Sequence, residues 1–226
     1  MSERPWDAEK SLVAGLQTGD EAVFADLVDD LHGRLLALAR TFTSSPVLAE
    51  DIVQETWLAV IRGVRGFEGR SSIRTWIYGI LVRRARTMAA RETRQRDVSI
   101  RAEGLGPDSP PEWKPGLGRV GLWEEPPASW GLEDPEAALR REEALRVVQG
   151  ALAGLPDNQR QVVLLRDIEG VGSADTCNIL GVSETNERVL LHRGRARVRR
   201  ALDQFFRDGV DRPRRKIHRI LTQGVR

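Results

Sequence analysis

Residues 155–202 constrain the fold of this chain more than any other stretch, because they carry the pattern of two short helices joined by a tight turn. A helical period over residues 173–180 ends at Gly181, which permits the left-handed backbone of a turn, and Ser183 is placed to cap a further helix that runs to about Phe206. In such a helix-turn-helix the second helix enters the major groove of DNA. The sequence therefore predicts a DNA-binding module in the C-terminal half of the chain.

The N-terminal part of the chain repeats apolar residues with the period of a helix face. Asp20 is placed to cap a helix whose apolar stripe consists of Phe24, Leu27, Val28, Leu31, Leu35 and Leu38. A helix over residues 47–62 follows, and then another that is capped by Ser71 or Ser72. With one preceding helix, these short-connected helices predict a compact all-helical domain of about 90 residues.

Between Asp97 and Pro135 the composition changes abruptly. Seven of the chain's 11 prolines and three of its six tryptophans fall there, and no helical period is sustained. Such a segment is typical of a linker, although a disordered tether is normally poor in aromatic residues. We expect Trp113, Trp123 and Trp130 either to become ordered on a partner or to fold back on the helical domains.

Charge is distributed in blocks, although the net charge is only +2. Residues 83–96 contain six arginines and one glutamate, and residues 184–200 contain six arginines and two glutamates. Residues 207–226 add seven basic and two acidic side chains, whereas residues 97–136 hold nine carboxylates and three basic residues. Basic surfaces separated by an acidic segment indicate two nucleic-acid-facing domains. Only three of the 35 basic residues are lysines, and arginine is the better match to phosphates and base edges.

These patterns predict an all-α chain of two small helical domains joined by an acidic linker that is rich in proline and tryptophan. The predicted parts are an N-terminal helical domain at 1–96, the linker at 97–135, a helix-turn-helix domain at 136–206 and a basic C-terminal tail at 207–226.

Other classes of protein are disfavoured by what the sequence lacks. The single Cys177 excludes an internal disulfide and a zinc site of several cysteines, and its place in the motif indicates packing. No apolar run approaches the roughly 20 residues of a membrane span, and the N-terminus lacks the apolar core of a signal peptide. We therefore expect a cytoplasmic protein without membrane insertion. Asp51 and Glu55, one helical turn apart, are the only candidate metal pair, but no histidine is near them and no catalytic motif is visible. We expect no enzyme activity, no metal and no cofactor.

Two segments carry a resemblance to a known family. Residues 48–92 contain the string AEDIVQETWL, and residues 155–199 contain LPDNQRQVVLLRDIEG. In this order, and separated by a linker, they resemble conserved regions 2 and 4 of bacterial RNA polymerase sigma factors of the extracytoplasmic-function class. The resemblance implies a subunit that binds core RNA polymerase, directs it to promoters and helps to open promoter DNA. The alternative is a stand-alone helix-turn-helix regulator that binds duplex DNA without polymerase.

The resemblance also implies roles for individual residues in region 2. Asp51, Gln54, Glu55 and Trp57 are similar to the surface that docks on the clamp helices of the polymerase beta-prime subunit. The loop over residues 65–72 is similar to one that captures a flipped base of the minus-ten element, and the helix after it meets the melting strand. The residues assigned in this way to minus-ten DNA are Arg65, Arg70, Ser71, Ser72, Arg74, Trp76, Arg83, Arg84 and Arg86.

Region 4 is similar to a module that holds the flap tip of the beta subunit and reads the minus-thirty-five element. The residues assigned to that element are Ser183, Glu184, Thr185, Asn186, Arg188, His192, Arg193 and Arg195. The linker would pass through the active-site channel of the polymerase, and the class implies an anti-sigma factor as a further partner. The chain departs from the family pattern at Arg83, where many members have asparagine, and at Glu187, where an apolar residue is common. A carboxylate at Glu187 repels phosphate unless it pairs with Arg188 or accepts a hydrogen bond from a cytosine amino group.

Overall fold

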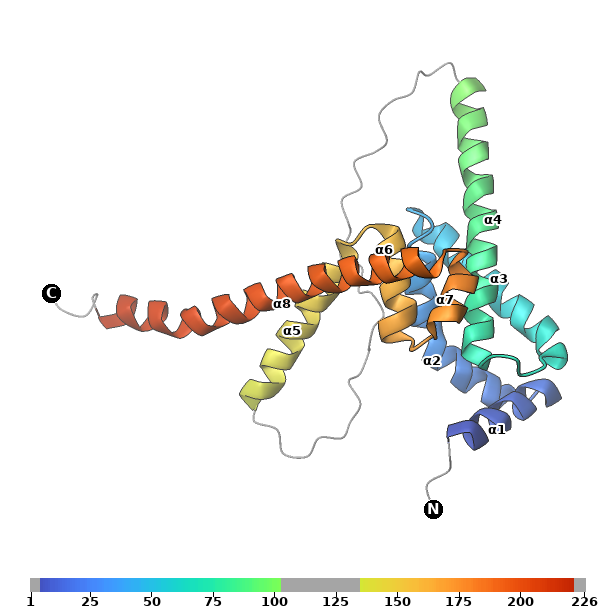
Figure 1. The fold of residues 1–226 in the computed structure, drawn as a ribbon, viewed down its shortest axis with the longest axis horizontal. Coiled ribbons are helices and arrows are strands. Elements are labelled where there is room, and N and C mark those ends of the chain that lie inside the picture. The colour runs from blue at the N-terminus through green and yellow to red at the C-terminus, as the bar shows by residue number, and fades with distance from the viewer. Residues whose placement is uncertain (1–4, 103–134, 222–226) are drawn as a thin grey trace.

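The computed structural model describes residues 5–102 and 135–221, and within these ranges the chain is helical and contains no strand. The elements are α1 (Pro5–Thr18), α2 (Glu21–Ala39), α3 (Pro46–Gly63), η1 (Val64–Gly66), α4 (Ile73–Ala102), α5 (Pro135–Ala153), α6 (Asp157–Val163), η2 (Leu164–Ile168), α7 (Ser173–Leu180) and α8 (Glu184–Leu221). The predicted all-α fold is confirmed (Figure 1). The linker tryptophans Trp113, Trp123 and Trp130 lie outside the described residues.

The N-terminal helices begin where short polar side chains satisfy free backbone N–H groups. The Asp20 carboxylate accepts hydrogen bonds from the first turn of α2, and Ser45 accepts one from the backbone N–H of Leu48 at 3.2 Å. Ser72 caps α4, because its hydroxyl accepts from the backbone N–H of Thr75 at 3.1 Å. The predicted cap at Asp20 is therefore confirmed, and of the two candidates for α4, Ser71 and Ser72, the structure selects Ser72.

Helices α1 to α4 enclose one apolar core, in which α3 packs along α4. Ile52 and Val60 of α3 and Ile77 and Leu81 of α4 are completely buried. Each such side chain contributes roughly 1.5–3 kcal/mol relative to an exposed position. Tyr78, which the apolar pattern did not single out, is 1% exposed beside them. This body holds the surfaces of α3 and α4 in a defined relation to each other.

In the C-terminal body, α8 packs against both α5 and α6. The approach to α6 is close at Gly194, where an added Cβ would lie 2.5 Å from Cγ2 of Val163. The predicted helix that begins after Pro156 is α-helical only as far as Val163. From Leu164 it continues as η2, a π-helical turn. Its wider winding is marked by the backbone N–H of Glu169, which donates to the carbonyl of Leu164 at 2.9 Å.

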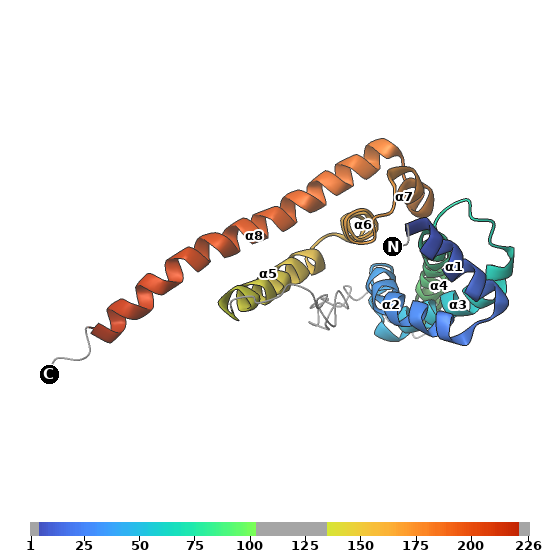
Figure 2. The ribbon, with the colours of Figure 1, turned by 90° about the horizontal axis from the view of Figure 1, so that it is seen from below.

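Two helices are longer than the sequence pattern predicted. Helix α4 continues to Ala102, past the expected start of the linker at Asp97, and α8 continues to Leu221 instead of ending near Phe206. Figure 1 shows both helices projecting from their bodies, and Figure 2 shows α8 as a long rod with α5 beside its middle part. No described helix is both long and apolar enough to cross a membrane.

The two bodies touch each other, with α7 lying against α4 (Figures 1 and 2). The guanidinium of Arg86 donates to the carbonyl of Leu180 at 2.5 Å, across the gap between these helices. The side-chain amide of Gln161 donates to the carbonyl of Thr41 at 3.3 Å. One contact surface therefore joins the basic helix of the first body to the helix-turn-helix of the second.

Candidate nucleic-acid interface

The helix-turn-helix consists of α7, a turn at Gly181 and the first turns of α8. Gly181 has φ +56°, a left-handed conformation that glycine adopts without strain. The Ser183 hydroxyl accepts from the backbone N–H of Asn186 at 3.3 Å and so caps α8. Every residue that the sequence assigned to the minus-thirty-five element is exposed: Ser183, Glu184, Thr185, Asn186, Arg188, His192, Arg193 and Arg195. The turn thus presents one polar and basic face of α8 to the outside.

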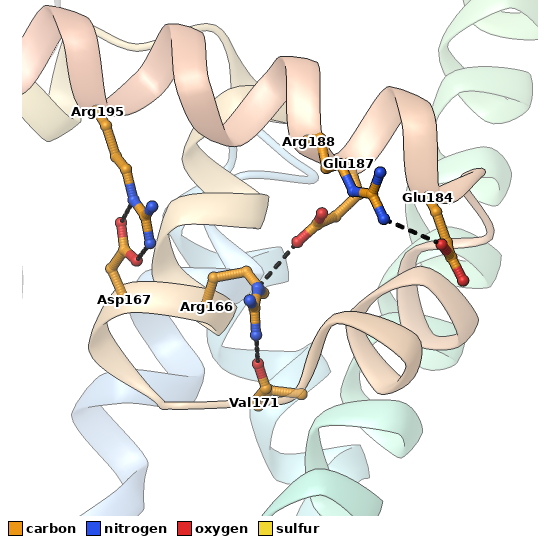
Figure 3. Close-up of polar contacts among 7 residues, drawn as sticks. All are labelled: Arg166, Asp167, Val171, Glu184, Glu187, Arg188 and Arg195. Carbon is orange, nitrogen blue, oxygen red and sulfur yellow. Dashed lines mark hydrogen bonds and ion pairs between the residues drawn. The ribbon is translucent and has the colours of Figure 1, made fainter.

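Glu187 differs from its neighbours, because it is only 1% exposed. Its Oε1 lies 2.9 Å from Nε of Arg166, which comes from η2 beneath the helix (Figure 3). Arg188 instead lies 3.4 Å from the carboxylate of Glu184 on the outer face. Glu187 therefore has a partner inside the protein, Arg166, which differs from both arrangements considered from the sequence, a pair with Arg188 or a hydrogen bond from cytosine. A one-dimensional pattern did not reveal the partner, since Arg166 and Glu187 are 21 positions apart.

Arg195 is also held by η2 (Figure 3). Its Nε and Nη2 donate to the two carboxylate oxygens of Asp167 at 2.9 and 2.5 Å, a bidentate pair. These hydrogen bonds raise the pKa of Arg195 above its ordinary value. The guanidinium is therefore already engaged by the protein on one side. Of the residues assigned to the minus-thirty-five element, Arg195 is the one with an ion pair to another element.

The assigned polymerase-docking residues divide into two groups on α3. Asp51 and Gln54 are exposed, and Glu55 is half-buried with its carboxylate 3.4 Å from Nη1 of Arg84. Trp57 is only 8% exposed, and its ring packs edge-on against Phe24 at a centroid distance of 5.7 Å. The prediction that Trp57 lies on the docking surface is wrong, because its large apolar ring fills the gap between α2 and α3.

The exposed face of α3 carries apolar residues that the sequence analysis missed. Val47, Leu58 and Ile61 are 71%, 44% and 53% exposed. Together with Asp51 and Gln54 they form a seam with alternating steps of four and three residues, and we call these five residues the α3 seam. That spacing is the signature of a helix that packs on another in a coiled coil. The signal was present in the sequence, but the wider buried stripe of the same helix obscured it.

The assigned loop between α3 and α4 is open to solvent at its basic residues. Arg65 and Arg70 are exposed, and Arg70 makes an ion pair with Glu68 at 3.1 Å. Ser71 is half-buried, whereas Ser72 is exposed but uses its hydroxyl to cap α4. The segment before the capped start of α4 therefore presents two exposed arginines to solvent, one of them paired with Glu68.

The basic residues of α4 make contacts within the protein. Arg83 is exposed and turns back on its own helix, and Arg84 pairs with Glu55 of α3. Arg86 donates to Leu180 of α7. Arg83 and Arg86 are thus both exposed and Arg84 is half-buried, and Arg86 faces the helix-turn-helix.

Two further assigned residues lie near the start of α4. Arg74 makes an ion pair with Asp30 of α2 at 2.7 Å, with both side chains more than a third exposed. Trp76 is half-buried, since its ring packs on Phe67 at 5.3 Å and lies against Gly63. Trp76 therefore supports the loop from below while keeping part of its ring accessible.

A buried acidic group lies where the two bodies meet. The Glu169 side chain is 5% exposed, and its carboxylate lies 3.6 Å from a guanidinium nitrogen of Arg34 in α2. Burial raises the pKa of Glu169, and the nearby side chains of Tyr78 and Arg34 lower it by a smaller amount. Burial and the nearby carboxylate of Glu169 also raise the pKa of Tyr78 far above its ordinary value. Neither the Tyr78 hydroxyl nor Oε2 of Glu169 has a hydrogen-bond partner of normal geometry.

Within residues 5–102 and 135–221, no group of three or more His, Cys, Asp or Glu side chains is arranged to hold a metal ion. The candidate pair of Asp51 and Glu55 has no third ligand there, and Glu55 is engaged by Arg84.

Comparison with known proteins matches both bodies. The family model for Sigma-70 region 2 matches residues 27–95, and that for Sigma-70 region 4 matches residues 145–198. The RNA polymerase sigma-H factor of Pseudomonas aeruginosa is 26% identical over 203 residues, which cover 89% of this chain and 97% of that protein. The ECF RNA polymerase sigma factor SigG of Mycobacterium tuberculosis is 32% identical over 191 residues, covering 82% of this chain and 50% of that protein.

Among solved structures, the sigma factor RpoE of Bartonella quintana, in complex with the anti-sigma factor NepR, is similar with 23% identity and a TM-score of 0.47. The likeness covers 80% of this chain and 96% of that one. The two matched regions, in this order, take up more than half of the 226 residues. The chain belongs to the Sigma-70 family and is an RNA polymerase sigma factor of the extracytoplasmic-function class, a non-catalytic transcription initiation factor that binds core polymerase and promoter DNA.

Proposed function

We propose that the α3 seam is the surface by which this sigma factor docks on the clamp helices of the polymerase beta-prime subunit. The observation that carries this proposal is the set of exposed apolar residues Val47, Leu58 and Ile61 at coiled-coil spacing. On a small domain, apolar side chains aligned in this way are suited to the grooves of a partner helix. Asp51 and Gln54, which lie between them, add polar contacts that set the register.

The loop over residues 65–72 and the outer face of α4 contact the minus-ten element in this proposal. Arg65 and Arg70 are exposed and flank Phe67 in the sequence, and the Phe67 ring packs on the half-buried Trp76, so the loop combines cations with aromatic rings. An unstacked base is bound by stacking and by cation contacts of this kind, with about 1–3 kcal/mol from each stacked base. The binding energy of the trapped base then helps to hold promoter DNA open without ATP.

The exposed face at the start of α8 reads the minus-thirty-five element. Glu184 and Arg188 lie side by side there, one an acceptor and the other a forked donor. Arginine recognises the O6 and N7 atoms of guanine, and a carboxylate accepts from the amino group of cytosine. Exposed arginines further along the helix neutralise phosphates and add affinity that depends on salt.

Held on core polymerase, the two bodies engage two promoter elements at once, so that the second contact becomes effectively intramolecular. The flap tip of the beta subunit holds the helix-turn-helix body, and the linker passes through the active-site channel. Membership of the class makes an anti-sigma factor a further partner. The chain supplies specificity and contributes no catalytic group of its own.

The docking role is tested by core polymerase affinity. Leu58→Asp and Ile61→Asp place carboxylates in the α3 seam and are expected to weaken binding at least tenfold without unfolding the protein. Leu145→Asp is the matched control, because Leu145 is an exposed leucine, 36% accessible, on the distant helix α5. Equal affinity of the wild type and the two seam variants would refute the assignment.

A stand-alone regulator is separated from a sigma factor by promoter binding with and without core polymerase. We expect the full chain to protect both promoter elements only when core polymerase is present, and run-off transcription to depend on the chain. Tight, sequence-specific binding to duplex DNA by the chain alone, with no effect of polymerase, would favour the regulator.

A further inference from the structure

We infer that Glu187 is a positioning residue for promoter recognition: its buried carboxylate, held by Arg166, sets the rotation of the recognition helix α8 and does not itself touch DNA. The inference rests on the proposed role of α8 in reading the minus-thirty-five element. It deepens that role, because it names which residue of the first turns is withdrawn from the DNA and what it does there.

Glu187 is buried, whereas its neighbours in the first turns of α8 are exposed. Glu184, Asn186 and Arg188 are exposed, while Glu187 is 1% exposed in the same two turns of helix. A side chain without accessible surface cannot reach a base edge or repel a phosphate at contact distance. A carboxylate is nonetheless costly to bury unless it is paired. The buried position of Glu187 therefore requires a positively charged partner inside the protein.

Arg166 is that partner, and it connects three elements. Its Nε lies 2.9 Å from Oε1 of Glu187, and its Nη1 donates to the carbonyl of Val171 at 2.6 Å (Figure 3). The first contact joins η2 to α8, and the second joins η2 to the segment that leads into α7. Neither Nε nor Oε1 has a hydrogen bond of its own, so the contact between them is ionic. In a buried setting such an attraction is strong, and the loss of either charge leaves the other uncompensated.

A second contact from the next residue of η2 makes the arrangement rigid. Asp167 holds Arg195 by two hydrogen bonds, eight residues further along α8 than Glu187. Two fixed points along a helix define both its rotation about its own axis and its displacement along it. Asp167 and Arg195 are partly exposed, at 30% and 54%, whereas the Glu187 side chain is 2% exposed, so the loss of its partner leaves Glu187 with a charge that water cannot screen. The π-helical turn places consecutive residues, Arg166 and Asp167, against the same neighbouring helix.

The size of the effect follows from helix geometry. Side chains end roughly 5 Å from the helix axis, so a rotation of about 20° moves them by roughly 2 Å. A hydrogen bond to a base edge spans about 2.7–3.2 Å and does not survive such a shift. Glu184 and Arg188 would then lose their alignment with bases, whereas nonspecific attraction to phosphates, which tolerates displacement, would remain.

The test uses the full chain bound to core polymerase and a pool of duplexes with a randomised upstream element and a constant downstream element. The sequence that the wild type selects is compared with a scrambled upstream element, and the ratio of the two affinities measures specificity. Glu187→Gln keeps the shape of the side chain and removes its charge. We expect the ratio to fall at least tenfold, while affinity for the scrambled duplex and its dependence on salt stay unchanged.

Arg166→Met should reproduce this loss, and the double variant should lose no more than either single variant, because the two residues act as one unit. Glu184→Gln is the matched comparison: the same chemical change on the exposed face should raise affinity for the scrambled duplex and alter its salt dependence. Glu142→Gln on α5, whose exposed carboxylate pairs with Arg146 of the same helix, should change neither quantity.

Two results would overturn the inference. One is a change of preference at a single base pair in Glu187→Gln with no effect of Arg166→Met, which would make Glu187 a direct reader. The other is a loss of folded protein, followed by urea unfolding, with an unaltered specificity ratio in the folded fraction, which would make the pair merely structural. If the wild type selects no upstream sequence at all, the proposed role of α8 itself fails, and that result is distinguishable from both.

Discussion

Gly194 lies where α8 crosses α6, and replacing it with alanine is expected to destabilise the helix-turn-helix body. The new Cβ would lie 2.5 Å from Cγ2 of Val163, with the carbonyl of Gln159 at 3.6 Å and Cδ1 of Leu155 at 3.8 Å. Carbon atoms in contact are normally about 3.5–4.0 Å apart, so the two helices must separate by roughly 1 Å. The substitution therefore tests whether the close approach at Gly194 is required for α8, the recognition helix, to pack against α6.

Two opposing effects determine the magnitude. Alanine in place of glycine within a helix gains about 1 kcal/mol from backbone propensity. Overpacking a filled core costs about 1–3 kcal/mol, and the cost is toward the upper end here, because Val163 is 4% exposed and its branched side chain is stiff at χ1. The expected net result is a loss of about 1–2 kcal/mol in the free energy of unfolding.

Urea unfolding followed by helical circular dichroism measures this difference. Gly150→Ala is the matched control, because Gly150 is also a helix glycine but has nothing within 4 Å of an added Cβ; it should gain up to about 1 kcal/mol. Val163→Ala alone should lose about 2 kcal/mol. Combined with Gly194→Ala it should lose clearly less than the sum, since the clashing methyl groups are gone. If Gly194→Ala is as stabilising as Gly150→Ala, or if the double variant is additive, the reasoning is refuted.

Three further outcomes are expected. Ser72→Ala removes the cap of α4 and should lower the free energy of unfolding by about 1 kcal/mol, whereas no change would show that the cap is dispensable. Trp57→Ala should lower the free energy of unfolding in urea by about 3–5 kcal/mol, while Leu58→Asp should leave it unchanged and lower polymerase affinity. The opposite pattern would show that Leu58 is the core residue and Trp57 the docking residue. Because burial raises the pKa of Glu169 in the folded chain, its contribution to stability is full below its ordinary value of 4.5 and is lost as pH rises through the folded pKa. Glu169→Gln should remove that part of the pH dependence of unfolding, and an unchanged pH profile would argue against the raised pKa.

Features that depend on neighbours along the chain were predictable. Asp20 and Ser72 cap helices because a short polar side chain reaches backbone N–H groups two or three residues ahead. Gly181 allows the turn of the helix-turn-helix because its φ is positive. The exposed face at the start of α8 also followed from helical period. In each of these cases the deciding partner is within a few residues.

Features that depend on the partner across the fold were not predictable. Trp57 was assigned to the docking surface by resemblance, but its ring packs against Phe24 of α2 and is buried. The α4 arginines were assigned to minus-ten DNA, and no pattern along the chain indicated that Arg86 reaches the carbonyl of Leu180 in the other body. Helix length was also underestimated, since α4 and α8 continue past the residues at which the apolar period stops.

The sequence alone determined that this chain is helical, that it has two basic bodies in the order of sigma regions 2 and 4, and where its recognition helix begins. These properties follow from local backbone preferences and from motifs that are read along the chain. The tertiary structure decided the direction of single side chains, above all that Glu187 points inward to Arg166 while Glu184 and Arg188 point outward. The physical reason is that a buried charge is stable only beside its counter-charge, and that counter-charge is supplied by a different helix.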